Sequence, residues 1–246
     1  MAQFNIRIAG TVFFVTSLFE STRDYCRSYL TEAPPEHSIA VCPDDLRYEQ
    51  QALDQEAAEE GLKRRKFSDP FLERAAIQRK AADFLLGRST LLLHGSGIAL
   101  DGKGYLFAAA RCGTGKSTHT GYWRQVFGSR CITVNDDKPF LQITSGGVTM
   151  HGAPWSGKHG LHTNISVPLQ GLCILERGSE NRILRLSPAE AFPLLLHQSL
   201  LPGTAADGRQ EQLVQMLAET VPLWCMTCTK DPRAAEVAFG AMSTTH

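Results

Sequence analysis

The glycine-rich stretch GTGKST, residues 113–118, has the residue types that bind a phosphate. Gly113 and Gly115 let the backbone fold round an anion so that successive N–H groups point inward. The Lys116 ammonium can reach the β- and γ-phosphates of a nucleotide, and the Ser117 hydroxyl can ligate Mg²⁺. The predicted cofactor-binding residues, for ATP and Mg²⁺, are Gly113, Thr114, Gly115, Lys116, Ser117 and Thr118. The alternative is a glycine-rich turn that happens to precede Lys-Ser.

The residues around this stretch fit the P-loop pattern G-x-x-x-x-G-K-[ST] with one change. Ala110 stands where glycine is commoner, and an ordinary backbone conformation at that position would allow it. An apolar run precedes the stretch and a helix-prone segment follows it. A helix that starts near Ser117 would direct its positive N-terminal end at the bound phosphate.

Two adjacent carboxylates, Asp136 and Asp137, follow Lys116 by about 20 residues, at the end of the β-branched run CITVN. Carboxylates at the end of a strand beside a phosphate loop can hold Mg²⁺ and accept a proton. Neighbours on a strand point to opposite sides, so one can face the metal and the other the acceptor if the strand has ended or bulged there. The alternative is an Asp-Asp turn that caps the strand.

The segment GAPWSGKHGLHTN, residues 152–164, carries the next candidates. Lys158 could stabilise the transferring phosphoryl group or meet the acceptor's own charge, since such transfer depends on positioning and charge stabilisation. The predicted substrate contacts are Trp155, as a flat apolar wall, together with His159, His162 and Asn164. The alternatives are a surface loop with solvated side chains, or a zinc site at the two histidines, for which no further ligand is evident.

The apolar runs and turn residues of the sequence predict the strands and helices that could position these residues. Two apolar runs flank Asp101-Gly102, a pair typical of a tight hairpin turn. The second run leads into GTGKST, so the neighbouring strand is predicted to be antiparallel. A hairpin over 4–16, a strand over 37–42 and helices over 44–60 and 69–86 precede it. Helices and one further strand are predicted after residue 187, and no linker marks a sharp boundary.

Composition narrows the possible functions. The chain has 246 residues, of which 43% are hydrophobic, and 25 basic residues balance 25 acidic ones. A net charge of zero argues against nucleic-acid binding, which depends on a basic face. No apolar run reaches the roughly 18 residues that span a bilayer. We therefore expect neither a nucleic-acid nor a membrane partner. Seven scattered cysteines suit a reducing compartment, so the prediction is a cytoplasmic protein. Cys225 and Cys228 are interpreted as strand residues.

The His94-Gly95 pair, the hairpin, GTGKST and the VNDD strand end together resemble the HPr kinase/phosphorylase and phosphoenolpyruvate carboxykinase superfamily. The nearer resemblance is to short bacterial HPr-kinase-like proteins of unassigned substrate, over about residues 90–200. It implies an α/β fold with a mixed, partly antiparallel sheet, a P-loop and flanking helices. That domain would be 87–246, with an α+β region, 1–86, packed on it.

The resemblance also implies roles for single residues. Asp136 and Asp137 serve as acceptor base and metal ligand, and we favour Asp136 as the base and Asp137, with Ser117, at the metal. His94 matches a histidine near that acidic pair, although by itself it could be a half-buried strand histidine. A second signature of the HPr kinases is not matched, and the chain is much shorter than phosphoenolpyruvate carboxykinases, so decarboxylation is not expected.

The function that these residues predict is an ATP- and Mg²⁺-dependent phosphotransferase. Its acceptor would be a hydroxyl of a small molecule, a peptide or a protein serine. The alternative is a nucleotide-binding regulatory or partner module without catalysis. The acidic pair favours the enzyme, because a protein that only binds a nucleotide has no use for two carboxylates at the strand end.

Overall fold

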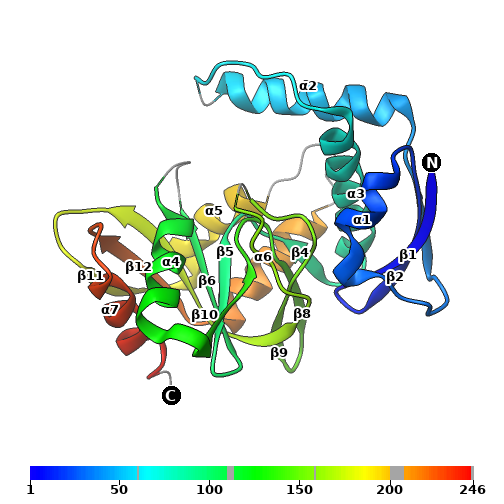
Figure 1. The fold of residues 1–246 in the computed structure, drawn as a ribbon. Helices are drawn as coiled ribbons and strands as arrows, with labels where there is room; N and C mark the ends of the chain where they lie inside the picture. The colour runs from blue at the N-terminus through cyan, green and yellow to red at the C-terminus, as the bar shows by residue number, and fades with distance from the viewer. Residues whose placement is uncertain (60, 110–113, 158, 200–207, 245–246) are drawn as a thin grey trace. The chain divides into compact units, whose positions relative to one another are not determined.

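The computed structural model describes the whole chain except residues 60, 110–113, 158, 200–207 and 245–246. The described residues form two compact units, residues 1–84 and the residues from 85 onward (Figure 1). Within the described residues no helix is long and apolar enough to cross a membrane.

The first unit contains a three-stranded sheet in the order β1-β2-β3. β1 (Ala2–Ile8) and β2 (Thr11–Ser17) are antiparallel, and β3 (His37–Ala40) runs parallel to β2. Alternate residues of β1 are buried, so the apolar alternation in the sequence corresponds to one covered face. The predicted hairpin and the predicted third strand are both confirmed.

Helices complete the first unit. They are α1 (Glu20–Tyr25), the short 3-10 helix η1 (Arg27–Tyr29), α2 (Pro43–Glu59) and α3 (Asp69–Leu86). α3 buries Glu73, Ile77 and Ala81, residues four apart that share one helix face. Its Phe84 ring packs edge-on against Phe13 of β2, with ring centroids 5.6 Å apart. The two predicted helices are therefore confirmed to within a residue at each end.

A nine-stranded sheet, counted over the described residues, is the centre of the second unit. Seven of its strands follow the order β4-β8-β9-β10-β6-β5-β7, and β12 pairs with β10 and β11. The strands are β4 (Thr90–Leu92), β5 (Ser96–Leu100), β6 (Lys103–Ala109), β7 (Cys131–Asn135), β8 (Phe140–Thr144), β9 (Gly147–His151), β10 (Ser166–Arg177), β11 (Arg182–Leu186) and β12 (Leu223–Cys228).

The directions of the central strands bring three chain segments to one edge. β5 is antiparallel to both β6 and β7, so β6 and β7 run the same way on either side of it. Their carboxyl ends and the start of β5 therefore lie together, and we call this end of the sheet the carboxyl edge. Asp101 and Gly102, with φ of 51° and 78°, make the predicted hairpin turn at the opposite end.

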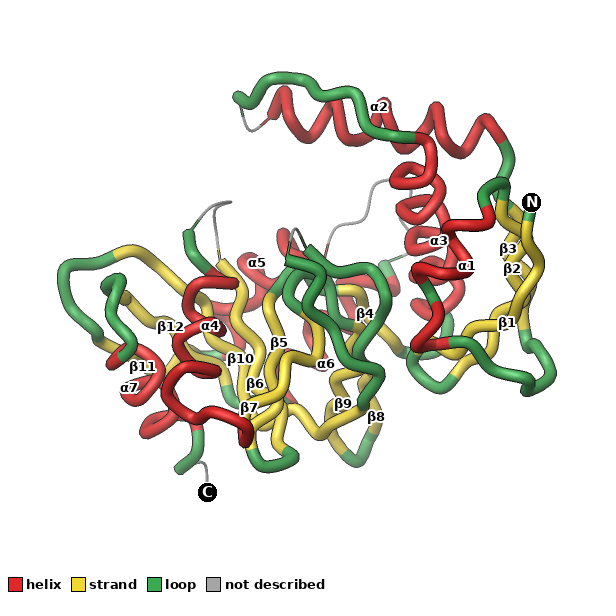
Figure 2. The backbone as a smooth tube through the Cα atoms, in the orientation of Figure 1, coloured by secondary structure: helices red, strands yellow, loops and turns green. Residues whose placement is uncertain are grey.

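Helices cover both faces of this sheet (Figure 2). α5 (Pro188–Ser199) and α6 (Arg209–Thr220) share a core with Leu106 and Ala108 of β6. α4 (Lys116–Phe127) and α7 (Arg233–Met242) share another with Tyr105 and Phe107, the alternate residues of the same strand. The predicted α/β architecture, a mixed sheet flanked by helices, is confirmed. Cys225 and Cys228 lie on β12, and residues three apart on a strand face opposite sides.

Candidate functional site

The start of α4 lies at the carboxyl edge, where β6 ends. Gly115 directly precedes the helix with φ of 111° and ψ of 27°, a conformation that side-chain-bearing residues rarely adopt. Lys116 is the first helical residue, and the N–H groups of this first turn have no partner within the helix. Lys116 and Ser117 are partly exposed and Thr118 is exposed. Gly113 and Ala110 lie outside the described residues.

Buried contacts fix this helix to the sheet. The Thr120 and Ser96 hydroxyls hydrogen-bond at 2.8 Å, which ties the N-terminal part of α4 to the start of β5. The fully buried Trp123 donates from Nε1 to Nε2 of His119 at 3.1 Å. Burial lowers the pKa of His119 to about 4, so its ring is neutral and can accept this bond. The position of Lys116 is thereby set relative to β5.

The end of β7 is shaped by Asn135, whose role the sequence analysis did not recognise. Its side-chain oxygen accepts hydrogen bonds from the backbone N–H groups of Asp137 at 2.9 Å and Lys138 at 2.8 Å. Its amide nitrogen donates to the carbonyl oxygens of Ala153 at 3.0 Å and Trp155 at 2.9 Å. One side chain therefore ends the strand and also anchors the 152–164 loop. An asparagine before Asp-Asp at a strand end was the available signal, because such side chains favour turns.

Asp136 is buried, with 3% of its surface exposed. Its Oδ1 accepts a hydrogen bond from the Gly157 backbone N–H at 2.7 Å, and its own N–H donates to the Leu161 carbonyl at 3.1 Å. Its Oδ2 is buried and has no hydrogen-bond partner among the described residues. Burial raises the pKa of Asp136 above its usual range, although the Gly157 N–H opposes this.

Asp137 and His94 face each other beside it. His94 Nε2 lies 3.5 Å from Asp137 Oδ1, and about a third of each side chain is exposed. The Gly95 N–H donates to the Asp137 carbonyl at 2.8 Å, which aligns the two segments. Burial, and then the positive charge of Lys116, lower the pKa of His94 to about 4, while Asp137 acts in the opposite direction. His94 is thus neutral near pH 7.

The 152–164 loop runs along the outer side of β7. The Thr163 N–H donates to the Val134 carbonyl at 3.1 Å, and His162 forms an antiparallel bridge with Asn135. Gly152 permits this close approach, because a Cβ there would lie 1.9 Å from the Thr163 carbonyl oxygen. The loop is therefore held at the same edge as the acidic pair.

The candidates within that loop differ in their surroundings. Trp155 is buried, and its ring lies edge-on to Phe140 with centroids 6.4 Å apart, so it supports the loop from within. His159 and Asn164 are exposed and His162 is partly exposed. Lys158 lies outside the described residues.

No group of three His, Cys, Asp or Glu side chains within the described part of the chain could hold a metal ion by itself. Mg²⁺ at a phosphate site usually keeps several waters and takes one or two carboxylates together with phosphate oxygens. The assignment of Ser117 and Asp137 as metal ligands stays a prediction of that kind.

No protein-family model matches the chain, and no curated protein matches its sequence. The structure brings the start of α4, His94 and the pair Asp136–Asp137 to one edge of one sheet.

Proposed function

We propose that this protein is an ATP- and Mg²⁺-dependent phosphotransferase of the HPr-kinase-like type. It would transfer a phosphoryl group to a hydroxyl of a small molecule, a peptide or a protein serine. One observation supports this most. The start of α4, which carries Lys116, and the end of β7, which is followed by two carboxylates, lie together at the carboxyl edge. The first suits a phosphate and the second suits a metal and a proton.

The nucleotide phosphates would lie against the first turn of α4. The backbone N–H groups of that turn and the Lys116 ammonium would supply the positive potential. Ser117 and Asp137 would hold Mg²⁺, which would neutralise charge on the phosphate oxygens. Asp137 suits that role because its side chain is partly exposed beside the neutral His94, which does not compete with the metal through a positive charge.

Asp136 would act as the base that accepts the proton of the attacking hydroxyl. Its raised pKa makes it a stronger base than an exposed aspartate, and one of its oxygens, Oδ2, has no partner in the described part of the chain. Lys158 would stabilise the transferring group, and His159, His162 and Asn164 would contact the acceptor. In this arrangement Asn135 holds the loop, and Trp155 fills its interior.

Nucleotide binding is tested by calorimetry with ATP and Mg²⁺. Lys116→Ala should abolish the binding signal, because the site loses its flexible cation. Lys103→Ala is the matched control, since Lys103 is exposed in the hairpin at the opposite end of β6. Equal affinity of wild type and Lys116→Ala for ATP would remove the phosphate site from the proposal.

Catalysis is tested separately by ADP release with a panel of hydroxyl metabolites and serine peptides. A kinase should release ADP faster with one class of acceptor than without any. A chain that binds ATP through Lys116 and releases ADP at the acceptor-free rate with every class would instead be the nucleotide-binding module.

A further inference from the structure

The first unit contains a helix with little covering. Over its length, Pro43–Glu59, α2 has Glu49 as its one buried residue. The chain then turns at Gly61 and runs back as an extended segment to Ser68, and α3 begins at Asp69. Helices in proteins obtain most of their stability from packing of an apolar face. A helix of this length with a single buried residue is therefore unusual.

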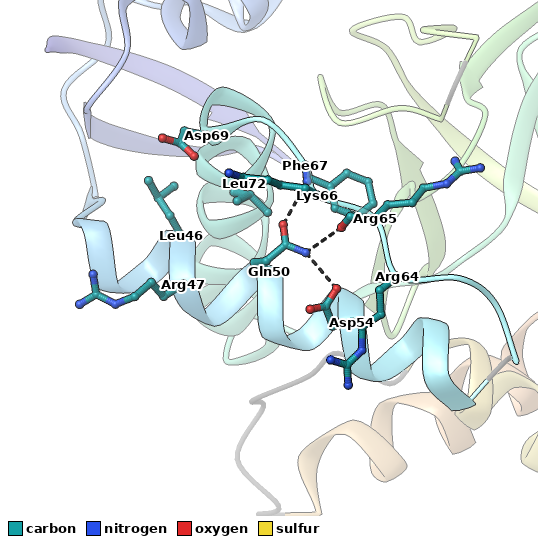
Figure 3. A pocket seen from close by; sticks show the side chains of 10 residues that line it. All are labelled: Leu46, Arg47, Gln50, Asp54, Arg64, Arg65, Lys66, Phe67, Asp69 and Leu72. Atoms are coloured by element: carbon teal, nitrogen blue, oxygen red, sulfur yellow. Dashed lines mark hydrogen bonds between the residues drawn. The ribbon is translucent and has the colours of Figure 1, made fainter.

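Gln50 fixes the returning segment to α2 (Figure 3). Its side-chain nitrogen donates to the Arg65 carbonyl at 2.9 Å and to Asp54 Oδ1 at 3.0 Å, while its oxygen accepts from the Phe67 N–H at 3.0 Å. The backbone at 65–67 is therefore held as it would be by a neighbouring strand. The side chains of the segment remain available on both of its sides.

Two hollows lie beside this segment. One, of about 440 Å³, has Leu46, Leu72 and Phe67 as its apolar lining. The other, of about 480 Å³, is lined by the apolar Leu53, Ala57 and Leu62 and by the charged Glu56 and Lys63. The two hollows share Arg65 and Phe67. Each is large enough to take apolar side chains. We call the pair and the segment between them the α2 groove.

The rim of the α2 groove is basic. Lys63, Arg64, Arg65 and Lys66 are consecutive and exposed, and no carboxylate within the described residues forms an ion pair with any of them. A run of four unpaired basic residues held on a fixed backbone attracts an acidic ligand. Apolar side chains lie next to this charge, since Leu62 is 58% exposed and Phe71 is 39% exposed.

We propose that the α2 groove binds an acidic segment of a partner protein. Aliphatic or aromatic side chains of that segment would enter the two hollows, and its carboxylates would pair with Arg64, Arg65 and Lys66. Such a ligand matches both the apolar lining and the basic rim.

A nucleic acid fits this surface less well. Phe67 is already stacked on Phe71, with ring centroids 4.9 Å apart and planes 18° from parallel, so one of its two faces is taken and cannot stack on a base. Asp54 and Asp69 also line the first hollow and would repel a phosphate backbone. An acidic peptide can place an apolar residue beside these two carboxylates, whereas a phosphate backbone carries a charge at every step.

The test is selection of a random 12-residue peptide library on the full-length protein, followed by affinity measurement with the selected peptides. We expect sequences in which Asp or Glu alternates with Leu or Phe. The triple variant Arg64→Glu, Arg65→Glu, Lys66→Glu should weaken their binding at least tenfold. A matched triple variant at other exposed arginines of this unit, Arg7→Glu, Arg23→Glu, Arg27→Glu, changes the net charge equally and should leave binding within about twofold.

A second variant separates shape from charge. Ala57→Trp should fill the second hollow and weaken the same peptides about tenfold while the rim keeps its charge. Three results would each overturn the proposal. They are selection of peptides without acidic residues, equal loss of binding in both triple variants, and binding of a single-stranded oligonucleotide that only the first triple variant abolishes. Self-association of the chain that the Arg64→Glu, Arg65→Glu, Lys66→Glu variant abolishes would also overturn it, because the groove would then bind a second copy of this chain.

Discussion

Glu73 in the first unit and Asp136 in the second are both buried carboxylates, and their hydrogen bonds differ sharply. Glu73 of α3, in the first unit, is fully buried and accepts hydrogen bonds from the backbone of Leu18 and Phe19 and from the Thr22 hydroxyl. Both of its oxygens are used, and they bind the donors at the start of α1. Asp136, in the second unit, uses Oδ1 for the Gly157 N–H and leaves Oδ2 without a partner in the described chain.

This difference separates an anchor from a candidate reactive group. A buried carboxylate whose hydrogen bonds are complete stabilises the local fold, and Glu73 does so by binding the two N–H groups that precede α1 and the Thr22 hydroxyl within it. A buried carboxylate with an unused oxygen lowers stability, and such groups in native proteins require an explanation. Asp136 lies at the edge where Lys116, His94 and Asp137 meet. A role in the candidate site would explain its unused oxygen.

The largest expected effect is on turnover. Asp136→Asn keeps an oxygen that can accept from Gly157 but removes the base, so ADP release with the true acceptor should fall by roughly 10²–10⁴. Thermal unfolding should occur at the same or a higher temperature, because a buried charge has been removed. Calorimetry should show unchanged ATP affinity. Wild-type turnover in this variant would show that Asp136 is an anchor like Glu73.

The converse variant, Glu73→Gln, should affect stability alone. The amide would present a donor to the N–H and O–H groups that now bind an oxygen, at a cost of about 3 kcal/mol in free energy of unfolding. Urea denaturation can assign the loss, because all three tryptophans, Trp123, Trp155 and Trp224, lie in the second unit. Circular dichroism should report the loss, and tryptophan fluorescence should change little. Turnover per folded molecule should stay at the wild-type value.

His119 tests whether a buried polar atom without a hydrogen-bond partner is by itself a sign of function. Its Nδ1 is buried with no partner in the described residues, but its ring packs against Phe107 inside the core. Its pKa of about 4 lies below the unfolded value of about 6.5, so the unfolded chain binds more protons between these values. The free energy of unfolding should therefore fall as pH drops from about 6.5 to 4.

His119→Gln should reduce that pH dependence by about 2 kcal/mol and leave turnover at pH 7.5 nearly unchanged. Denaturation series at pH 7 and pH 4.5 measure the change in the free energy of unfolding, and ADP release measures turnover. His151, whose pKa burial also lowers to about 4, remains as an internal reference for the acid effect. A large loss of turnover would mean that an unused buried atom marks function even inside the core.

Sequence patterns that extend over a few residues predicted much of the site. They did not predict the contacts between segments that are far apart in the sequence. Asp-Gly predicted the hairpin, Gly-Lys-Ser predicted the helix start, and the β-branched run predicted the strand that ends at Asn135. The sequence did not indicate that β10 pairs with β6 in parallel, or that Asn135 binds two carbonyl groups about 20 residues further on. Such contacts depend on which strands become neighbours, which periodicity does not encode.

The smallest expected effect concerns the charge state of His94, and it tests whether the edge acts as one electrostatic unit. Burial and Lys116 both hold the His94 pKa near 4, whereas Asp137, 3.5 Å away, raises it. In the nucleotide-free protein, Lys116→Ala should therefore raise the His94 pKa, and Asp137→Asn should lower it further. Nuclear magnetic resonance titration of the ring protons measures both shifts, with Lys103→Ala as the control that should leave the pKa unchanged. Identical His94 titrations in all four proteins would mean that burial alone sets its pKa. Lys116 and Asp137 would then be too far from His94, electrostatically, for the three to share one phosphate and one metal ion.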